Sequence, residues 1–322
     1  MSLIPKICEE LEQASRLLVA SHQNPEGDAI GSSLAILHHF PEKKIEVFNA
    51  DPLPYFLEFL PGSEKIIHKL DELSWDYELA LVLDCAHLGR VEKDFARRLQ
   101  GIRIINIDHH QSNCQFGELN LVEAQASSTG EILYQLFSHL GRPISRDTAT
   151  CLYTAIMMDT GSFRYINTTP TSLEIAYHLT KLGANPAYIA RQVYERHPPA
   201  RLLLLAQTLQ TLKFGSEGRR AEIVLTQEMF KKAGASPSMA EGFINYLTSV
   251  RGVEVAILFR ELELGRYKVS FRSQGKVNVA KLAEELGGGG HFQASGATLE
   301  GKLEEIQALV RKKVDELIAQ VK

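Results

Sequence analysis

The sequence predicts an α/β protein whose N-terminal part contains a mostly parallel, doubly wound sheet. Four runs are apolar along nearly their whole length, and helical patterns such as 29–40 and 89–100 lie between them. Strands of this kind are typical of a parallel sheet with helices over both faces. The four predicted strands are RLLVASH (16–22), KIEVFNA (44–50), ELALVLD (78–84) and IRIINID (102–108).

Helices dominate the next part of the chain. The predicted helices 128–141 and 145–161 each begin at a serine suited to an N-cap and end at glycine. A helix at 171–183 and a long helical stretch from 186 to 212 follow. The remainder is mixed and predicts a smaller α/β domain, with strands at 220–226, 252–262 and 266–273, a glycine run at 287–290 and a closing helix at 304–321.

The length of the chain predicts two domains. Its 322 residues exceed what one hydrophobic core usually serves. We expect an N-terminal domain at 1–190, a helical connector at 191–212 and a C-terminal domain at 213–322. The part before residue 213 is acidic and the part after it is mildly basic. This asymmetry suits a metal site that faces an anion-binding lobe.

The composition narrows the class of protein. Hydrophobic residues make up 44% and charged residues 23% of the chain, as in ordinary globular proteins. The net charge of −4 argues against a dedicated binder of long nucleic acid. The apolar stretches are far shorter than the roughly 20 residues that cross a bilayer. The start of the chain lacks a signal-peptide core and the cysteines form no close pair, so we expect a cytoplasmic protein.

Three of the four predicted strands run into ionisable residues. In an open α/β sheet, ligand sites form at the carboxyl edge of the strands. We therefore expect these side chains in one crevice, although they are far apart in the sequence. They are His22, with Glu26 and Asp28 shortly after it, then Asp84, and then Asp108, His109 and His110.

A fourth contribution comes from a predicted helix. Leu152, Ile156 and Asp159 fall on one face of the helix 145–161, because they are spaced four and three residues apart. An aspartate on a buried stripe must be paired, hydrogen-bonded or bound to a metal. We therefore expect Asp159 to join the strand-end residues.

The chemistry of these residues indicates divalent metal ions. Imidazoles and carboxylates without cysteine suit an ion such as Mn²⁺ better than a thiolate zinc site. Two ions bridged by a shared carboxylate use all the donors and are a common device for phosphoester hydrolysis. Their charge also compensates the burial of the acids. Taken alone, Asp28 is better explained as the N-cap of a helix that begins at Ala29, and Asp84 equally well as a cap or strand end.

With these residues in place, the sequence resembles the DHH phosphoesterase family. Within the family it is similar to the nanoRNase and 3′,5′-bisphosphate nucleotidase group, relatives of the RecJ exonuclease, over nearly the whole chain. The C-terminal motifs SFRS (270–273) and GGGGHFQASGA (287–297) mark a DHH-associated domain. The N-terminal motifs are HQNPEGDAIGS (22–32), LVLDCAHLGR (81–90), NIDHHQSN (106–113) and MMDTGSFRY (157–165).

The resemblance implies two divalent ions, Mn²⁺ in the first place, with Mg²⁺ or Co²⁺ as alternatives. His110 and the bridging Asp84 are implied as the catalytic residues, with His110 on the scissile phosphate. Asp108 is implied to orient the histidines from behind. The implied ligands are His22, Glu26 and Asp84 for one ion, and Asp28, Asp84, His109 and Asp159 for the other.

Glu26 departs from the family pattern, which usually has aspartate at this position. Glutamate keeps the carboxylate but reaches one methylene further. We expect it to ligate the metal with altered geometry and metal preference. A weakened first metal site is the hypothesis that follows.

The glycine run at 287–290 is a candidate anion-binding site. Gly287 to Gly290 leave their backbone amides unshielded, and they are expected to form an anion cradle beside His291. A flexible loop would look the same, but Arg272 upstream favours a nucleotide-phosphate clamp. Arginine grips phosphate bidentately, and Arg164 is a second such residue unless it is a solvated surface side chain. The predicted substrate-binding set is Arg164, Arg272, Ser273, Gly288, Gly289, Gly290 and His291.

We therefore expect a metal-dependent phosphoesterase with its substrate between the two domains. The expected substrates are short RNA or DNA oligonucleotides, linear dinucleotides such as pApA and pGpG, and the nucleotide pAp. The acidity of the chain disfavours long single strands. One alternative is a pyrophosphatase or exopolyphosphatase of the same superfamily, and another is a non-catalytic nucleotide-binding regulatory protein. No membrane partner is expected, and a homodimer is compatible with the sequence.

Overall fold

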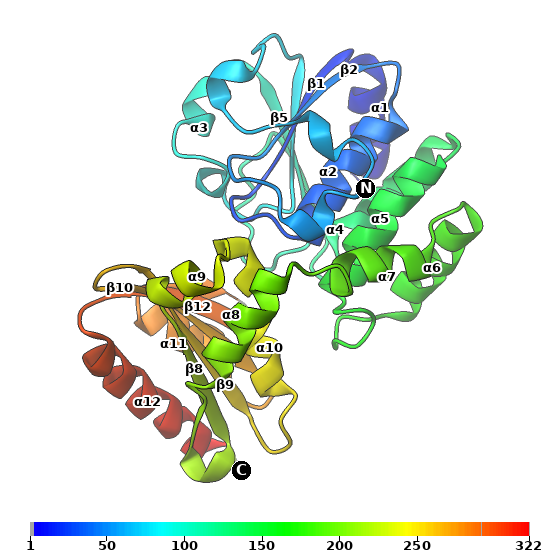
Figure 1. Cartoon of the computed structure of the whole chain (residues 1–322). Coiled ribbons are helices and arrows are strands. Elements are labelled where there is room, and N and C mark those ends of the chain that lie inside the picture. Colours follow the sequence, from blue (N-terminus) through cyan, green and yellow to red (C-terminus); the bar gives the residue numbers. More distant parts are fainter. Residues whose placement is uncertain (1–2, 291, 322) are drawn as a thin grey trace. The chain divides into compact units, whose positions relative to one another are not determined.

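The computed structural model describes residues 3–290 and 292–321 and divides into two compact units. The first unit extends to Arg196 and the second begins at His197 (Figure 1). The predicted connector 191–212 is therefore divided between the two units. The helix α7 (Pro186–Tyr194) lies in the first unit and α8 (Pro199–Leu209) in the second.

The first unit is built on the predicted parallel sheet. All neighbouring strands in it are parallel, in the order β3-β2-β1-β4-β5-β6. The four predicted strands are confirmed, and β3 and β6 extend the sheet at its two edges. The strands are β1 (Arg16–Ser21), β2 (Lys44–Phe48), β3 (Ile66–Ile67), β4 (Leu79–Leu83), β5 (Arg103–Asp108) and β6 (Leu119–Val122).

One face of this sheet packs against long helices. Leu17, Val19 and Val47 point into a core that these helices share. The chain forms these helices where the sequence offers N-caps: Ser128 and Ser145 accept bonds from the third amides of α4 and α5. The helices of the unit on this side are α1 (Ile4–Gln13), α2 (Gly27–His39), α4 (Thr129–Leu140), α5 (Arg146–Asp159), α6 (Pro170–Lys181) and α7.

Short elements cover the opposite face of the sheet. Phe48 and Phe95 stack there with ring centroids 5.5 Å apart. The long helix predicted at 89–100 is wrong, because Glu92 accepts a hydrogen bond from the backbone N–H of Asp94 (2.9 Å) and turns the chain. The elements here are η3 (Leu70–Glu72), η4 (Leu88–Arg90) and α3 (Phe95–Arg98), and η1 (Tyr55–Leu57) and η2 (Ser63–Lys65) also belong to this unit.

The helices α2 and α5 approach each other unusually closely. A Cβ atom at Gly31 would lie 2.6 Å from the carbonyl oxygen of Cys151, and one at Gly27 would lie 2.2 Å from the sulfur of Met158. Only glycine permits this distance. The two helices therefore bring their polar residues, Asp28 and Asp159, toward the same end of the sheet.

The second unit holds a mixed sheet in the order β11-β12-β10-β9-β8-β7, with β8 and β9 parallel and the other pairs antiparallel. Helices lie on both faces, as Figure 1 shows. The strands are β7 (Lys213–Gly215), β8 (Arg220–Leu225), β9 (Val255–Glu263), β10 (Arg266–Ser273), β11 (Gly289–Gly290) and β12 (Ala294–Glu300). The helices are α8, α9 (Gln227–Ala233), α10 (Phe243–Thr248), α11 (Val279–Glu285) and α12 (Leu303–Gln320), with η5 (Ser216–Gly218) and η6 (Pro237–Ala240).

The predicted helical stretch 186–212 is two helices. Pro198 and Pro199 lie between them, and Pro199 occupies the first turn of α8, where its missing N–H costs nothing. Within the described ranges, none of the helices has the length and apolar character that a membrane crossing requires.

Candidate metal centre

The carboxyl edge of the first sheet gathers most of the predicted metal ligands. The Nε2 atom of His109 lies 3.6 Å from Asp84 Oδ1, 3.7 Å from Asp159 Oδ2 and 3.9 Å from Asp28 Oδ2. These carboxylates come from the end of β4, the end of α5 and the first turn of α2. The prediction that distant segments meet here therefore agrees with the geometry.

Asp84 lies among three imidazoles. Its Oδ2 is 3.5 Å from His22 Nε2, and its Oδ1 is 3.6 Å from both His109 Nε2 and His110 Nδ1. Its backbone has φ 51°, in the left-handed region that non-glycine residues rarely adopt. The residue directly follows β4, and its N–H donates to Ile107 of β5. This strained turn aims the carboxylate into the cluster instead of along the strand.

Asp28 is held by the start of a second helix. It accepts hydrogen bonds from the backbone N–H groups of Thr129 (2.7 Å) and Gly130 (2.9 Å), and from the Ser32 hydroxyl (3.0 Å). The N-terminal amides of α4 thus fix and stabilise the carboxylate. The simple capping explanation for Asp28 does not hold, because Glu26 occupies the N-cap position of α2.

Asp108 orients His110 from behind the centre. It is fully buried, and its Oδ1 lies 2.7 Å from His110 Nδ1 and accepts the backbone N–H of His109. Its Oδ2 accepts a hydrogen bond from Asn113 Nδ2 (2.6 Å). A proton on Nδ1 leaves Nε2 of His110 as the other reactive nitrogen.

Asp159 is oriented by Asn167. The amide of Asn167 donates to Asp159 Oδ2 (3.3 Å) and to the carbonyl of Ser127 (3.0 Å). Sequence reasoning missed Asn113, Asn167 and the α4 amides. Asn113 had a local signal, its position five residues after Asp108 in the same loop, but the contact of Asp28 with Thr129 spans 101 residues and had none.

The charges of the cluster are strongly coupled. Burial, together with the charge of Asp84, raises the pKa of Asp28 to about 6, and burial raises the pKa of Asp159 well above its usual range. Burial opposes protonation of His109, but Asp159, Asp28 and Asp84 outweigh it and raise its pKa to about 9. Burial also opposes the charge of Asp84, but the neighbouring histidines lower its pKa to about 2. The cluster is therefore a site that attracts positive charge.

The donor set fits divalent cations. Two groups have ligand atoms within 4.8 Å of one another, one of Asp84, His109 and His110 and one of Asp28, His109 and Asp159. Oxygen and imidazole donors of this kind suit borderline and hard divalent ions. Glu26 is exposed and belongs to neither group, whereas His22 reaches the cluster through Asp84.

The predicted substrate residues are more dispersed. Arg164 is exposed, and its Nε donates to the carbonyl of Gly161 (2.6 Å). In the second unit, Arg272 and Ser273 end β10, with Arg272 half-buried and Ser273 buried. His291 lies outside the described residues.

The glycine run is more ordered than a loose loop. Gly289 and Gly290 form β11 and pair with Gly296 and Ser295 of β12. The Gly288 amide donates to the carbonyl of Ala283 (2.7 Å), so it is already engaged. A Cβ at Gly288 would lie 2.1 Å from the carbonyl oxygen of Gly296, which explains why this position has no side chain.

Comparisons with known proteins agree with the site. Residues 16–156 match the DHH family, N-terminal domain, and residues 222–320 match the DHHA1 domain. The chain belongs to the DHH family of phosphoesterases. Within that family it belongs to the group of the bifunctional oligoribonuclease and PAP phosphatase NrnA, and it is a phosphoric ester hydrolase.

Two relatives and a solved structure carry this assignment. The chain is 35% identical to NrnA of Thermus thermophilus over 94% of this chain and 89% of the relative. It is 29% identical to NrnA of Bacillus subtilis over 88% and 89%. The crystal structure of an exopolyphosphatase-related protein from Bacteroides fragilis matches with a TM-score of 0.90 and 31% identity, over 97% of this chain and 95% of that one.

RecJ from Thermus thermophilus in complex with Mn²⁺ is a more distant match. Its TM-score is 0.57 at 15% identity, over 99% of this chain and 55% of RecJ. At this identity the likeness concerns the fold alone.

Proposed function

We propose that this protein hydrolyses short oligoribonucleotides and linear dinucleotides to mononucleotides, and removes the 3′-phosphate of pAp. The observation that carries the proposal is the convergence of Asp28, Asp84, His109 and Asp159 at one sheet edge. The names of the NrnA relatives support the substrate classes. We place the activity in the cytoplasm, as the sequence predicts.

We propose that the cluster holds two divalent ions, Mn²⁺ above all. One would be held by His22, Glu26 and Asp84, and the other by Asp28, Asp84, His109 and Asp159. Bound divalent ions polarise a phosphoester and generate a hydroxide nucleophile from water near neutral pH. The 3.5–3.9 Å separations between the imidazole and carboxylate atoms support this assignment for His22, Asp28, Asp84, His109 and Asp159.

In this proposal the residues of the chain position the phosphate and the charges around it. The Nδ1 of His110 is engaged by Asp108, so Nε2 is the nitrogen that contacts the scissile phosphate. Asp108 and Asn113 keep that ring in place through the reaction. A fixed donor that meets developing negative charge is worth more than one that must reorganise.

We assign nucleotide binding to the second unit. Arg272 supplies a guanidinium at the end of β10, next to Ser273. The glycines of β11 belong to the same sheet, because β12 pairs with both strands. Arginine binds phosphate through two parallel hydrogen bonds. Arg164 is assigned the same role in the first unit, because it lies on the turn that directly follows Asp159.

A substrate screen with Mn²⁺ tests the proposal. The substrates are di- to pentanucleotides, pAp, pyrophosphate and the generic diester bis-p-nitrophenyl phosphate. We expect mononucleotides from the oligonucleotides and phosphate from pAp. Hydrolysis of pyrophosphate alone would make the protein a pyrophosphatase, an outcome worth testing because the similar Bacteroides protein is described as exopolyphosphatase-related. Binding of pAp without turnover would make it a nucleotide-binding regulator.

A further inference from the structure

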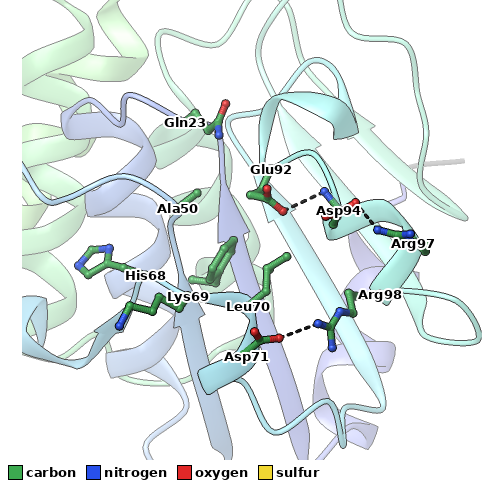
Figure 2. A pocket seen from close by; sticks show the side chains of 11 residues that line it. Gln23, Ala50, His68, Lys69, Leu70, Asp71, Glu92, Asp94, Arg97 and Arg98 are labelled. Carbon is green, nitrogen blue, oxygen red and sulfur yellow. Dashed lines mark hydrogen bonds and ion pairs between the residues drawn. The ribbon is translucent and has the colours of Figure 1, made fainter.

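A cavity of about 600 Å³ opens on the first unit, and one of its lining residues, Gln23, directly follows the candidate metal ligand His22. Figure 2 shows Gln23 at one end, His68 to Asp71 along one side and Glu92 to Arg98 along the other. Its floor includes Phe48 and Leu70, on the sheet face opposite α2. The volume falls in the range of about 300–1,000 Å³ that is typical of small-molecule sites.

The cavity is tied directly to the metal centre. Gln23 follows His22, whose Nε2 is 3.5 Å from Asp84. The backbone N–H of Gln23 donates to the backbone carbonyl of Arg90 (2.7 Å). The carbonyl of Gln23 lies 2.7 Å from His22 Nδ1. The metal cluster and the cavity wall therefore include consecutive residues, His22 and Gln23, whose Cα atoms are about 3.8 Å apart.

The charges of the cavity balance. Arg98 lies 2.6 Å from Asp71, and Arg97 is paired with Asp94. A phosphate pocket presents positive charge that no neighbouring acid cancels. This cavity instead alternates donors and acceptors, which suits a neutral, polar group. Its positively charged lining residues are Lys69, Arg97 and Arg98, and its negatively charged ones are Asp71, Glu92 and Asp94.

His68 offers a flat surface at a fixed orientation. Its Nδ1 lies 2.8 Å from the carbonyl of Asn49, while the residue itself is exposed. The side chain of buried Asn49 donates to the backbone carbonyl of His22 (2.9 Å), so one residue contacts both the His68 ring, through its own carbonyl, and the loop that carries His22. Exposed aromatic rings of this kind stack with nucleobases.

We propose that this cavity binds the nucleoside part of one substrate nucleotide while its phosphate lies at the metal centre. The inference rests on the proposed function and deepens it. The base stacks on His68, and its polar edge exchanges hydrogen bonds with the carboxylates and guanidiniums of the rim. The cavity thereby selects nucleotide esters over phosphoesters without a nucleoside.

Two variants test the cavity by kinetics. His68→Ala removes the stacking surface, and Ala50→Phe fills the cavity from its half-buried wall. The readout is kcat/KM for pApA and pGpG divided by kcat/KM for bis-p-nitrophenyl phosphate. We expect this ratio to fall about tenfold in both variants, mainly through KM. Lys65→Ala, an exposed cation outside the cavity lining, is the matched control and should keep the wild-type ratio.

A ratio within twofold of wild type in both variants would overturn the proposal. Binding gives an independent readout, because Trp75 is the one tryptophan of the chain and the Arg98 guanidinium lies 5.6 Å from its ring. Adenosine or guanosine should change Trp75 fluorescence saturably, and both variants should weaken that binding about tenfold. If the wild-type protein hydrolyses none of the esters, the proposed function fails. The fluorescence titration still tests nucleoside binding in the cavity, and the absence of a saturable change would overturn that proposal.

Discussion

Asp84 shows at the scale of one residue how the centre is built. Its left-handed φ of 51° costs of order 1 kcal/mol for a residue with a side chain. Glycine would adopt this turn without strain but would leave three imidazoles without a shared carboxylate. The sequence indicated Asp84 because it follows an apolar strand. The backbone angle that aims it had no signal in the residue pattern.

Asn113 gives a prediction at the same scale. Asn113→Ala should lower kcat about 10- to 100-fold, because Asp108 loses the hydrogen bond that fixes it against His110. The KM for dinucleotides should stay near its wild-type value, since no substrate contact is removed. Steady-state kinetics with pApA check this. Asn120→Ala, in the following strand, is the matched control, and equal losses in both variants would show a general structural effect instead of positioning.

At the scale of elements, the close contact between α2 and α5 places the ligands of two helices. Their glycines leave no space for a side chain, and Asp28 and Asp159 both approach the Nε2 atom of His109, at 3.9 Å and 3.7 Å. Periodicity predicted both helices. It did not predict the break in 89–100, because that break depends on a local hydrogen bond to Glu92. It also did not predict the division of the helical stretch 186–212 at Pro198.

Gly31→Ala tests this contact. The added methyl would lie 2.6 Å from the Cys151 carbonyl, so the helices must separate. We expect the free energy of unfolding to fall by about 1–3 kcal/mol, together with a weaker affinity for Mn²⁺. Denaturant unfolding and metal titration measure the two effects. Gly89→Ala is the control, because its added methyl has no closer neighbour than 4.0 Å, and an equal loss there would remove the argument from helix packing.

At the scale of the whole molecule, stability depends on groups buried away from water. His39 is buried against Phe137 with ring centroids 3.7 Å apart, and neither ring nitrogen has a hydrogen-bond partner within residues 3–290 and 292–321. Burial, aided by the charge of Arg142, lowers the pKa of His39 to about 4. The folded protein therefore holds this ring neutral where an unfolded chain would protonate it.

The buried, neutral His39 ring makes the stability of the folded protein depend on pH. Because its pKa in the folded state lies below the ordinary value of 6.5, His39 reduces stability as the pH falls from about 6.5 toward 4. Between pH 6.5 and pH 5 the loss should approach about 2 kcal/mol. Urea unfolding of wild type and His39→Leu at pH 7 and pH 5 checks this. The variant should lose less stability over that interval, and parallel losses would show that the burial of His39 does not cause the pH dependence.

The gathering of the strand ends at one sheet edge is the part of the whole molecule that sequence reasoning reached best. The strand ends near His22, Asp84 and His109 converge because parallel strands share one carboxyl edge. Glu26 is the exception: it is exposed at the N-cap of α2 and belongs to neither group of ligand atoms. The contacts that orient the ligands come from segments whose proximity only the folded chain creates.

Metal analysis tests the central claim most directly. Wild type and Asp84→Asn would be dialysed against Mn²⁺ and the bound metal counted per chain, with hydrolysis of pApA measured on the same samples. We expect two Mn²⁺ ions and activity in the wild type, and in the variant fewer ions and a loss of activity of about a thousandfold or more. An active wild type that binds no divalent metal, or a variant with two ions and full activity, would contradict it.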